Sequence, residues 1–148
     1  MLRDRNLIPL SHQHQHALAL CVQIERSLQA GAADLEALQA QIGTMFNLET
    51  RWHFAAEEEA LFPDAAAFAE LKPLVEELLN QHATLRHYFT RAQARELNST
   101  SLREFAQALS AHIRKEEREL FETCQRLFSP EKLSAVGAAL DAALHRTT

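Results

Sequence analysis

The sequence contains one charged phrase twice, as HFAAEEEALFP at residues 53–63 and as HIRKEERELFE at residues 112–122. Both copies read His, three residues, Glu-Glu, two residues, Leu-Phe. A His and a Glu four residues apart on a helix lie on the same face, about one turn from each other. Each copy therefore predicts a helix that presents an imidazole and a carboxylate to the same side.

The composition around these phrases favours helix throughout. The chain has 148 residues with only 3 Gly and 4 Pro, and the residues that dominate it, such as Ala, Leu, Glu, Gln and Arg, are good helix formers. A chain of this length can bury a substantial core as one unit. We therefore expect an all-α protein with a single domain over residues 1–148.

Capping residues and helix breakers divide the first half of the chain into two long helices. Ser11 is a suitable cap for a first helix, which we expect to end before Gly31. A second helix starts near Asp34 and stops before Pro63 in this interpretation. Residues 64–71 are Ala-rich, so we expect a linker or a short helical turn there.

The second half of the chain repeats this organisation. Pro73 suits the first turn of a third helix, and the polar run at residues 98–101 ends that helix and caps a fourth. A Ser-Pro pair at residues 129–130 starts a short C-terminal fifth helix, at about residues 130–146. Four amphipathic helices with short links predict an up-down-up-down four-helix bundle, with its core at about residues 9–128.

Charge and cysteine content exclude several classes of function. The formal net charge is −5 without a basic stripe, so we expect no nucleic-acid partner. Neither a secretory leader nor a run of about 18 apolar residues is evident, so we expect a cytoplasmic protein without a membrane partner. Cys21 and Cys124 form no CxxC motif, and we interpret them as reduced, buried thiols.

Polar residues fall on the predicted inner faces of all four long helices. His82, for example, continues the apolar stripe between Leu78 and Leu85. Buried carboxylates must be paired, protonated or bound to a metal, because isolation costs several kcal/mol. Such a set could bind two metal ions, which each Glu would bridge, and its donors suit iron, manganese or zinc. The candidate metal ligands are His14, His53, Glu57, His82, His112 and Glu116.

Each of these residues alone has a simpler interpretation. One His on an apolar face is more often a hydrogen-bonded core residue, and one His-x3-Glu is more often a surface pair. We nevertheless favour a metal site over coincidence, because each of the four helices places a His inward and two of them repeat the same phrase. The flanking His12 and His16 could bind metal at the surface or replace His14 as a ligand, but we favour their interpretation as polar residues in the first helical turn. Glu49, one turn before His53, is a candidate hydrogen-bond partner of that histidine.

Four segments together resemble the hemerythrin-like (HHE cation-binding) family, over about residues 9–128. They are PLSHQHQHALAL (9–20), HFAAEEEALFP (53–63), NQHATLRHYF (80–89) and HIRKEERELF (112–121). The resemblance implies a four-helix bundle that holds two non-haem iron ions as an oxo- or hydroxo-bridged diiron centre. It implies bridging carboxylates at Glu57 and Glu116, and one pair of histidines for each iron: His14 with His53, and His82 with His112.

The sequence also departs from the oxygen-carrying members of that family. Those members have a further His one turn after the third-helix His, where this chain has Arg86. They also tend to have His-x4-Asp on the last helix, where this chain has His-x3-Glu. Fewer His ligands leave more open coordination positions, which favours reactivity or sensing over simple carriage. Arg86 could hold a bridging carboxylate or lie at the edge of the site.

Three functions are consistent with these residues. The first, which we favour, is a diiron protein that binds or senses a small diatomic molecule such as O2 or NO. The second is a diiron oxidoreductase that handles peroxide, NO or iron for iron–sulfur repair, although the repair proteins of the family carry a further Cys-containing domain. The third is a redox-silent cation-binding or interaction bundle. No catalytic residue beyond the metal ligands is evident, so the sequence leaves open whether the protein is an enzyme.

Overall fold

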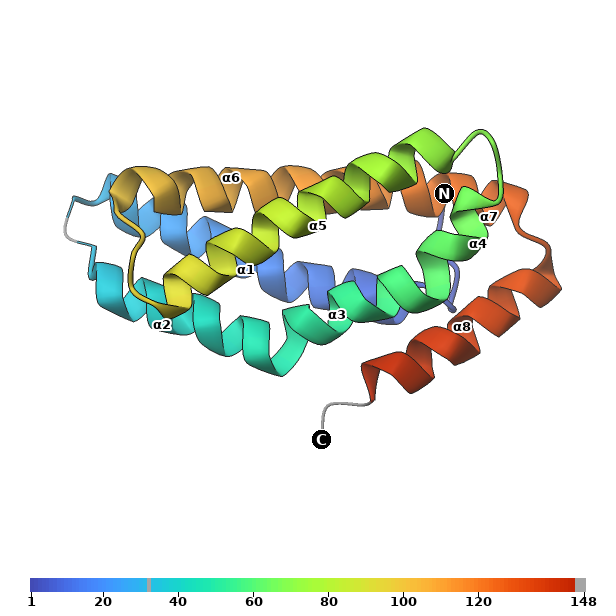
Figure 1. Cartoon of the computed structure of the whole chain (residues 1–148), viewed down its shortest axis with the longest axis horizontal. Helices are drawn as coiled ribbons and strands as arrows, with labels where there is room; N and C mark the ends of the chain where they lie inside the picture. The colour runs from blue at the N-terminus through green and yellow to red at the C-terminus, as the bar shows by residue number, and fades with distance from the viewer. Residues whose placement is uncertain (32, 146–148) are drawn as a thin grey trace.

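The computed structural model describes residues 1–31 and 33–145, and every regular element in them is helical, as the sequence predicts (Figure 1). Three stretches, labelled η, have the wider π-helical turn and continue directly from the α-helices around them. In chain order the elements are α1 (Ile8–Gln29), α2 (Leu35–Met45), η1 (Phe46–Thr50), α3 (Arg51–Ala56), η2 (Glu57–Leu61), α4 (Phe62–Ala66), α5 (Lys72–Gln93), α6 (Ser99–Lys115), η3 (Glu116–Phe121), α7 (Glu122–Leu127) and α8 (Pro130–Leu144).

The first helix begins earlier than its sequence suggests. Helix α1 starts at Ile8, because Pro9 fits the first helical turn and Leu7 takes the cap position without a side-chain hydrogen bond. The prediction that Ser11 caps this helix is therefore wrong. The Ser11 hydroxyl instead donates to the Glu117 carboxylate at 2.7 Å, so this side chain supports a distant contact.

The second long helix starts where the sequence predicts and ends later. The Asp34 side chain accepts a hydrogen bond from the Ala37 amide and caps α2. The helix then continues through η1, α3 and η2 past Pro63 to Ala66, so the predicted end before Pro63 is wrong. The π-helical turn of η2 already interrupts the regular hydrogen-bond ladder, and Pro63 follows it in the first turn of α4, where its missing N–H costs little.

The remaining helix starts agree with the sequence. Pro73 lies in the first turn of α5, and Asn98 caps α6 in a reciprocal capping box with Ser101. Ser129 accepts from the Lys132 amide and caps α8. Helix α8 ends at Leu144, and the last residue of its predicted range, 146, lies outside the described residues.

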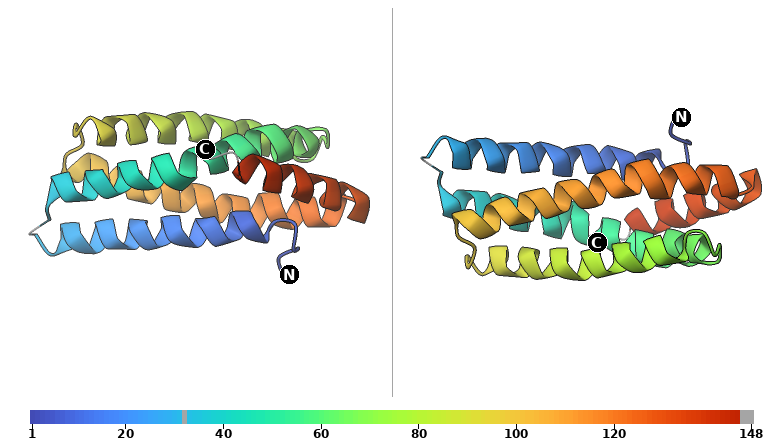
Figure 2. Two further views of the ribbon diagram at one scale, coloured as in Figure 1. Left: turned by 90° about the horizontal axis from the view of Figure 1, so that it is seen from below. Right: turned by 90° about the horizontal axis from the view of Figure 1, so that it is seen from above.

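The long helices lie side by side as a helical bundle. Helix α1 packs along α6, α2 packs along α5, and α5 also contacts α6 (Figures 1 and 2). Helix α8, drawn in red, turns back and packs against α3 and η2. Among the described residues, no helix is long and apolar enough to cross a membrane.

The apolar core has two parts that meet at a polar layer. One cluster includes Leu10 and Leu78, and the other includes Ala17 and Leu85. On α1 the buried residue between the two clusters is His14, and the corresponding residue on α5 is His82. Both cysteines are buried free thiols, as expected, one in each cluster. The fold therefore places a layer of polar side chains between two apolar halves.

Candidate metal centre

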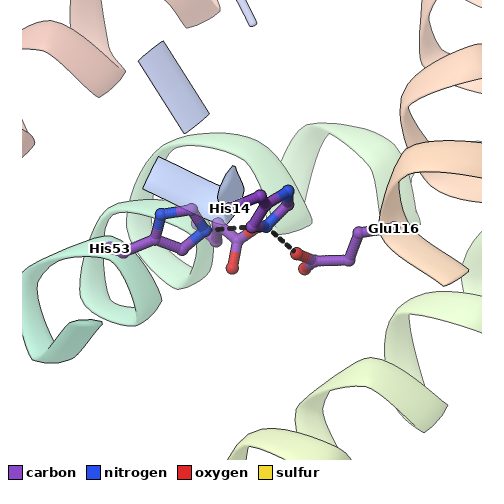
Figure 3. A group of neighbouring side chains, drawn as sticks. His14, His53 and Glu116 are labelled. Atoms are coloured by element: carbon purple, nitrogen blue, oxygen red, sulfur yellow. Dashed lines mark hydrogen bonds and ion pairs between the residues drawn. The ribbon is translucent and has the colours of Figure 1, made fainter. Parts of the chain in front are cut away.

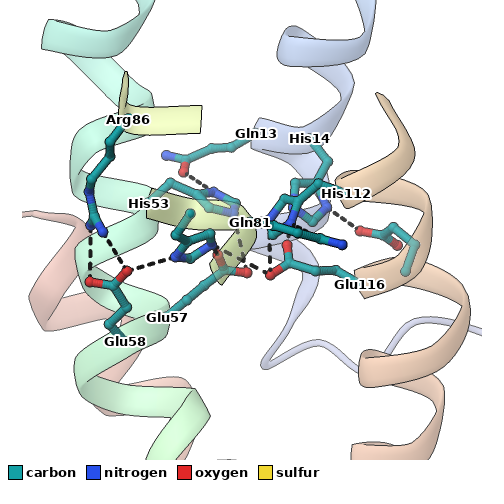
Figure 4. Close-up of polar contacts among 11 residues, drawn as sticks. Gln13, His14, His53, Glu57, Glu58, Gln81, Arg86, His112 and Glu116 are labelled. Atoms are coloured by element: carbon teal, nitrogen blue, oxygen red, sulfur yellow. Dashed lines mark hydrogen bonds and ion pairs between the residues drawn. The ribbon is translucent and has the colours of Figure 1, made fainter. Parts of the chain in front are cut away.

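All six predicted ligands are buried and meet in this polar layer (Figure 4). They form two overlapping groups, and in each group one donor atom per residue lies within 4.8 Å of the others. Both groups share the two carboxylates, and each adds one pair of histidines. The groups are His14, His53, Glu57 and Glu116, and Glu57, His82, His112 and Glu116.

Each carboxylate lies between a histidine of its own helix and a histidine of another. Glu57 is 3.5 Å from His53 Nε2 and 3.2 Å from His82 Nε2. Glu116 is likewise 3.5 Å from His112 Nε2 and 2.9 Å from His14 Nε2. Figure 3 shows His14, His53 and Glu116 converging from three separate elements. The arrangement has an approximate twofold relation that follows the doubled phrase.

The donor atoms fit a metal because six of them make no hydrogen bond. Among the described residues, most buried side-chain N and O atoms without a hydrogen bond belong to this site, and the other two belong to Arg3 and Glu122. Buried polar groups are rarely left unsatisfied, since each costs about 1–3 kcal/mol or more. A cation at the centre would satisfy all six site atoms at once. They are His53 Nε2, Glu57 Oε1 and Oε2, His82 Nε2, His112 Nε2 and Glu116 Oε2.

The electrostatics of the cluster also favour a cation. Burial and the nearby charge of Glu57 raise the pKa of Glu116 to about 8. Burial opposes ionisation of Glu57 as well, but His53 and His82 outweigh it and hold the pKa of Glu57 well below its ordinary value. Burial lowers the pKa of His112 to about 3, so its imidazole is neutral at pH 7 and can donate a lone pair. Positive charge between the carboxylates would allow both to ionise.

The second Glu of each phrase supports a histidine of the other half. Glu58 Oε2 lies 2.7 Å from His82 Nδ1, and Glu117 Oε2 lies 2.6 Å from His14 Nδ1. A carboxylate on Nδ1 fixes the tautomer and orientation of an imidazole and makes its Nε2 a stronger ligand. In each Glu-Glu pair, the first residue therefore faces the centre, and the second orients a histidine of the cluster.

An arginine in turn holds each of these outer carboxylates. Arg86 donates to both oxygens of Glu58, at 2.7 and 3.0 Å, and Arg3 lies 3.1 Å from Glu117 Oε1. Of the two predicted positions for Arg86, the structure shows the one at the edge of the site. Arg86 holds Glu58, a carboxylate that does not face the centre. Burial alone would raise the pKa of Glu58, but hydrogen bonds from His82 and Arg86 lower it to about 2.

Two glutamines hold the other pair of histidines, and the sequence reasoning missed them. Gln13 Oε1 lies 2.9 Å from His53 Nδ1, and Gln81 Oε1 lies 2.7 Å from His112 Nδ1. The proposed partner of His53, Glu49, is wrong, because Glu49 pairs with His16 at 3.0 Å. Gln13 and Gln81 each precede a cluster histidine, but the Gln-His pair at residues 15–16 is exposed, so this dipeptide alone does not identify them.

Both copies of the phrase contain a π-helical turn at the same position. Stretch η2 begins at Glu57 and stretch η3 begins at Glu116, the two carboxylates at the centre. Such turns are rare and are often found at functional sites. In each turn the first Glu faces the centre, and the Glu that follows it contacts a histidine of the other half.

The remaining histidines lie away from the centre. His12 and His16 are exposed on α1, so neither replaces His14, which is 4 % exposed. His87 on α5 and His145 after α8 are also exposed.

A small cavity borders the cluster on one side. The volume that the centre of a water-sized molecule can occupy in it is about 10 Å³. The cavity therefore has room for about one such molecule. Its walls include Phe54, Leu109 and Ile113 together with the cluster histidines His14, His53 and His112. The space is therefore mostly apolar and adjoins both groups of donors.

Comparison with known proteins agrees with this geometry. The chain belongs to the hemerythrin HHE cation binding domain family, whose model matches residues 9–124. No curated protein and no solved structure matches the chain. Family membership implies a metal cation, and the buried His and Glu groups fit a metal-binding site.

Proposed function

We propose that this protein holds two non-haem iron ions between its four His and two Glu ligands and binds or senses a diatomic molecule such as O2 or NO. His14 and His53 would hold one iron, His82 and His112 the other, and both carboxylates would bridge them. The observation that carries the proposal is the convergence of buried donor atoms without hydrogen-bond partners. Imidazole and carboxylate suit iron, although manganese or zinc could occupy the same cage.

Cavity size supports a diatomic ligand. Room for about one water-sized molecule next to His53 and His112 suits a small molecule such as O2 or NO. Phe54, Leu109 and Ile113 give that space an apolar wall. A diiron centre, when bound, supplies open coordination positions and electrons for such a molecule. The surrounding chain orients the imidazoles through Gln13, Gln81 and the outer carboxylates.

The same proposal covers the wider organisation of the chain. We infer a single domain over residues 1–148, in which the four long helical segments run up-down-up-down around the centre. Free, buried cysteines are typical of a reducing compartment, so we propose a cytoplasmic location. The acidic net charge favours neither nucleic acid nor an anionic membrane surface as a partner.

Anaerobic loading with ferrous iron, followed by exposure to O2 or NO, tests this function. The wild type should develop the visible absorption of a diiron centre with either gas, and Glu116→Ala should not, because it removes a bridging ligand. Glu119→Ala is the matched control, since Glu119 lies on the same π-helical stretch with a side chain that is 57 % exposed. An iron-loaded wild type that responds to neither gas would contradict the proposal. Turnover of peroxide without a stable gas adduct would favour the oxidoreductase function instead.

A further inference from the structure

A pair of histidines that are not among the predicted ligands of the buried centre lies on the surface of α1. His12 and His16 are one helical turn apart, both are exposed, and their ring centroids are 4.9 Å apart with a tilt of 58°. Two histidines at this spacing on one helix face are a recurrent zinc-binding arrangement. The buried cluster does not use either residue, so both are available for another ligand.

A carboxylate from another element lies beside His16. Glu49 belongs to η1, and its two oxygens lie 3.0 and 3.1 Å from His16 Nδ1. Metal–nitrogen and metal–oxygen bonds of about 2.0–2.2 Å place neighbouring ligands on one ion about 3 Å apart. The observed separation therefore already matches two ligands of one ion. The exposed His12 ring can turn to supply a third, because exposed side chains change rotamer within nanoseconds.

The position of Glu49 connects this surface group with the interior. Glu49 also lines the cavity that His14, His53 and His112 border. Glu49 thus contacts the exposed His16 and also borders the space beside the buried cluster. An ion held by these three residues would be at the edge of that cavity.

We propose that His12, His16 and Glu49 form a second, exposed site for a divalent transition-metal ion, and that this site captures ions bound for the buried centre. Two imidazoles and one carboxylate suit Zn²⁺, Co²⁺ or Fe²⁺, with water at the remaining positions. Three ligands on an exposed surface bind more weakly than the buried cage and release the ion readily. The capture role rests on the proposed function, whereas the surface site does not.

Calorimetric titration of the full chain with Zn²⁺ tests the surface site. The wild type should take up one more equivalent of Zn²⁺ than the double variant His12→Gln/His16→Gln. His87→Gln is the matched control, because His87 is exposed on another helix without a histidine one turn away, and it should retain the wild-type number. Equal Zn²⁺ uptake by the wild type and the double variant would overturn the proposal.

The rate of ferrous loading tests the capture role. With limiting Fe²⁺ under anaerobic conditions, the double variant should fill the buried centre several-fold more slowly and still reach the wild-type iron content. If the double variant binds one equivalent of Zn²⁺ fewer but loads iron at the wild-type rate, the capture role is overturned and the surface site is retained. A wild type that binds surface Zn²⁺ but retains no iron would instead contradict the proposed function.

Discussion

Glu58 and Glu117 act on the metal centre through the histidines that they hold. Replacing Glu58 by Gln keeps a hydrogen-bond acceptor for His82 Nδ1 but removes the negative charge and one oxygen contact with Arg86. We expect Glu58→Gln to weaken metal affinity about 10–100-fold, because the imidazole loses basicity and orientation. A competition titration with Co²⁺ and a chromophoric chelator measures this change.

Two further variants sharpen that experiment. Glu117→Gln should produce a similar loss through His14, since its carboxylate occupies the related position. Glu119→Gln should retain wild-type affinity, because its exposed side chain contacts Lys115 at the surface. Equal affinities for all three variants would show that the outer carboxylates do not tune the centre.

At the residue scale, sequence reasoning finds the residues that face the centre better than those that support them. The six candidate ligands repeat at helical spacing on apolar faces, so periodicity reveals them. Gln13 and Gln81 are polar residues beside a histidine, and nothing in a helical period distinguishes them from solvated glutamines. Glu49 was assigned to His53 by spacing along one helix, but the nearer partner, His16, comes from a different helix.

At the element scale, helix α8 depends on close contact with the N-terminal segment. A Cβ added at Gly137 would lie 2.7 Å from Asn6 Cβ and 2.1 Å from Asn6 Oδ1, which is too close for either atom. We expect Gly137→Ala to lower the free energy of unfolding by about 1–3 kcal/mol, despite the higher helix propensity of Ala. Urea denaturation followed by circular dichroism measures this loss.

A neighbouring substitution separates packing from helix propensity. Ser134→Ala lies on an exposed turn of the same helix, and it should be neutral or slightly stabilising. If Gly137→Ala stabilised the protein as much as Ser134→Ala does, the close packing of α8 on the N-terminal segment would be refuted.

Helix boundaries were predictable where a side chain makes a local hydrogen bond. Asp34, Asn98 and Ser129 each cap a helix with bonds to residues three positions later, so the sequence contains the whole interaction. The helix end predicted before Pro63 was wrong, because the helix accommodates this proline directly after a π-helical turn. That turn forms around a buried carboxylate of the cluster, which is a tertiary feature that local propensity does not encode.

At the scale of the whole molecule, the buried centre joins all four long helical segments. A ligand that binds the folded state and not the unfolded state stabilises the fold by about 2.7 kcal/mol at 100 times its Kd. For a chain of this size, that free energy corresponds to a rise in Tm of about 5–10 °C. We therefore expect Tm to rise by this amount when metal-free protein receives Fe²⁺ under anaerobic conditions.

The variant that lacks a bridging carboxylate provides the control for this measurement. Glu116→Ala should fold, because Glu117 still pairs with His14 after the Glu116 carboxyl is removed, but its Tm should change little on addition of Fe²⁺. A Tm that rises equally in the wild type and in Glu116→Ala would mean that the stabilising ions bind elsewhere.

The number of iron ions that each chain retains tests the central claim most directly. The measurement is elemental analysis of the full chain after anaerobic ferrous loading and a wash with a chelator that removes exposed ions. The account predicts close to two irons per chain, since the two donor groups share both carboxylates. Retention of no iron by the wild type would contradict the diiron proposal and leave a zinc-binding or structural role for the buried cluster.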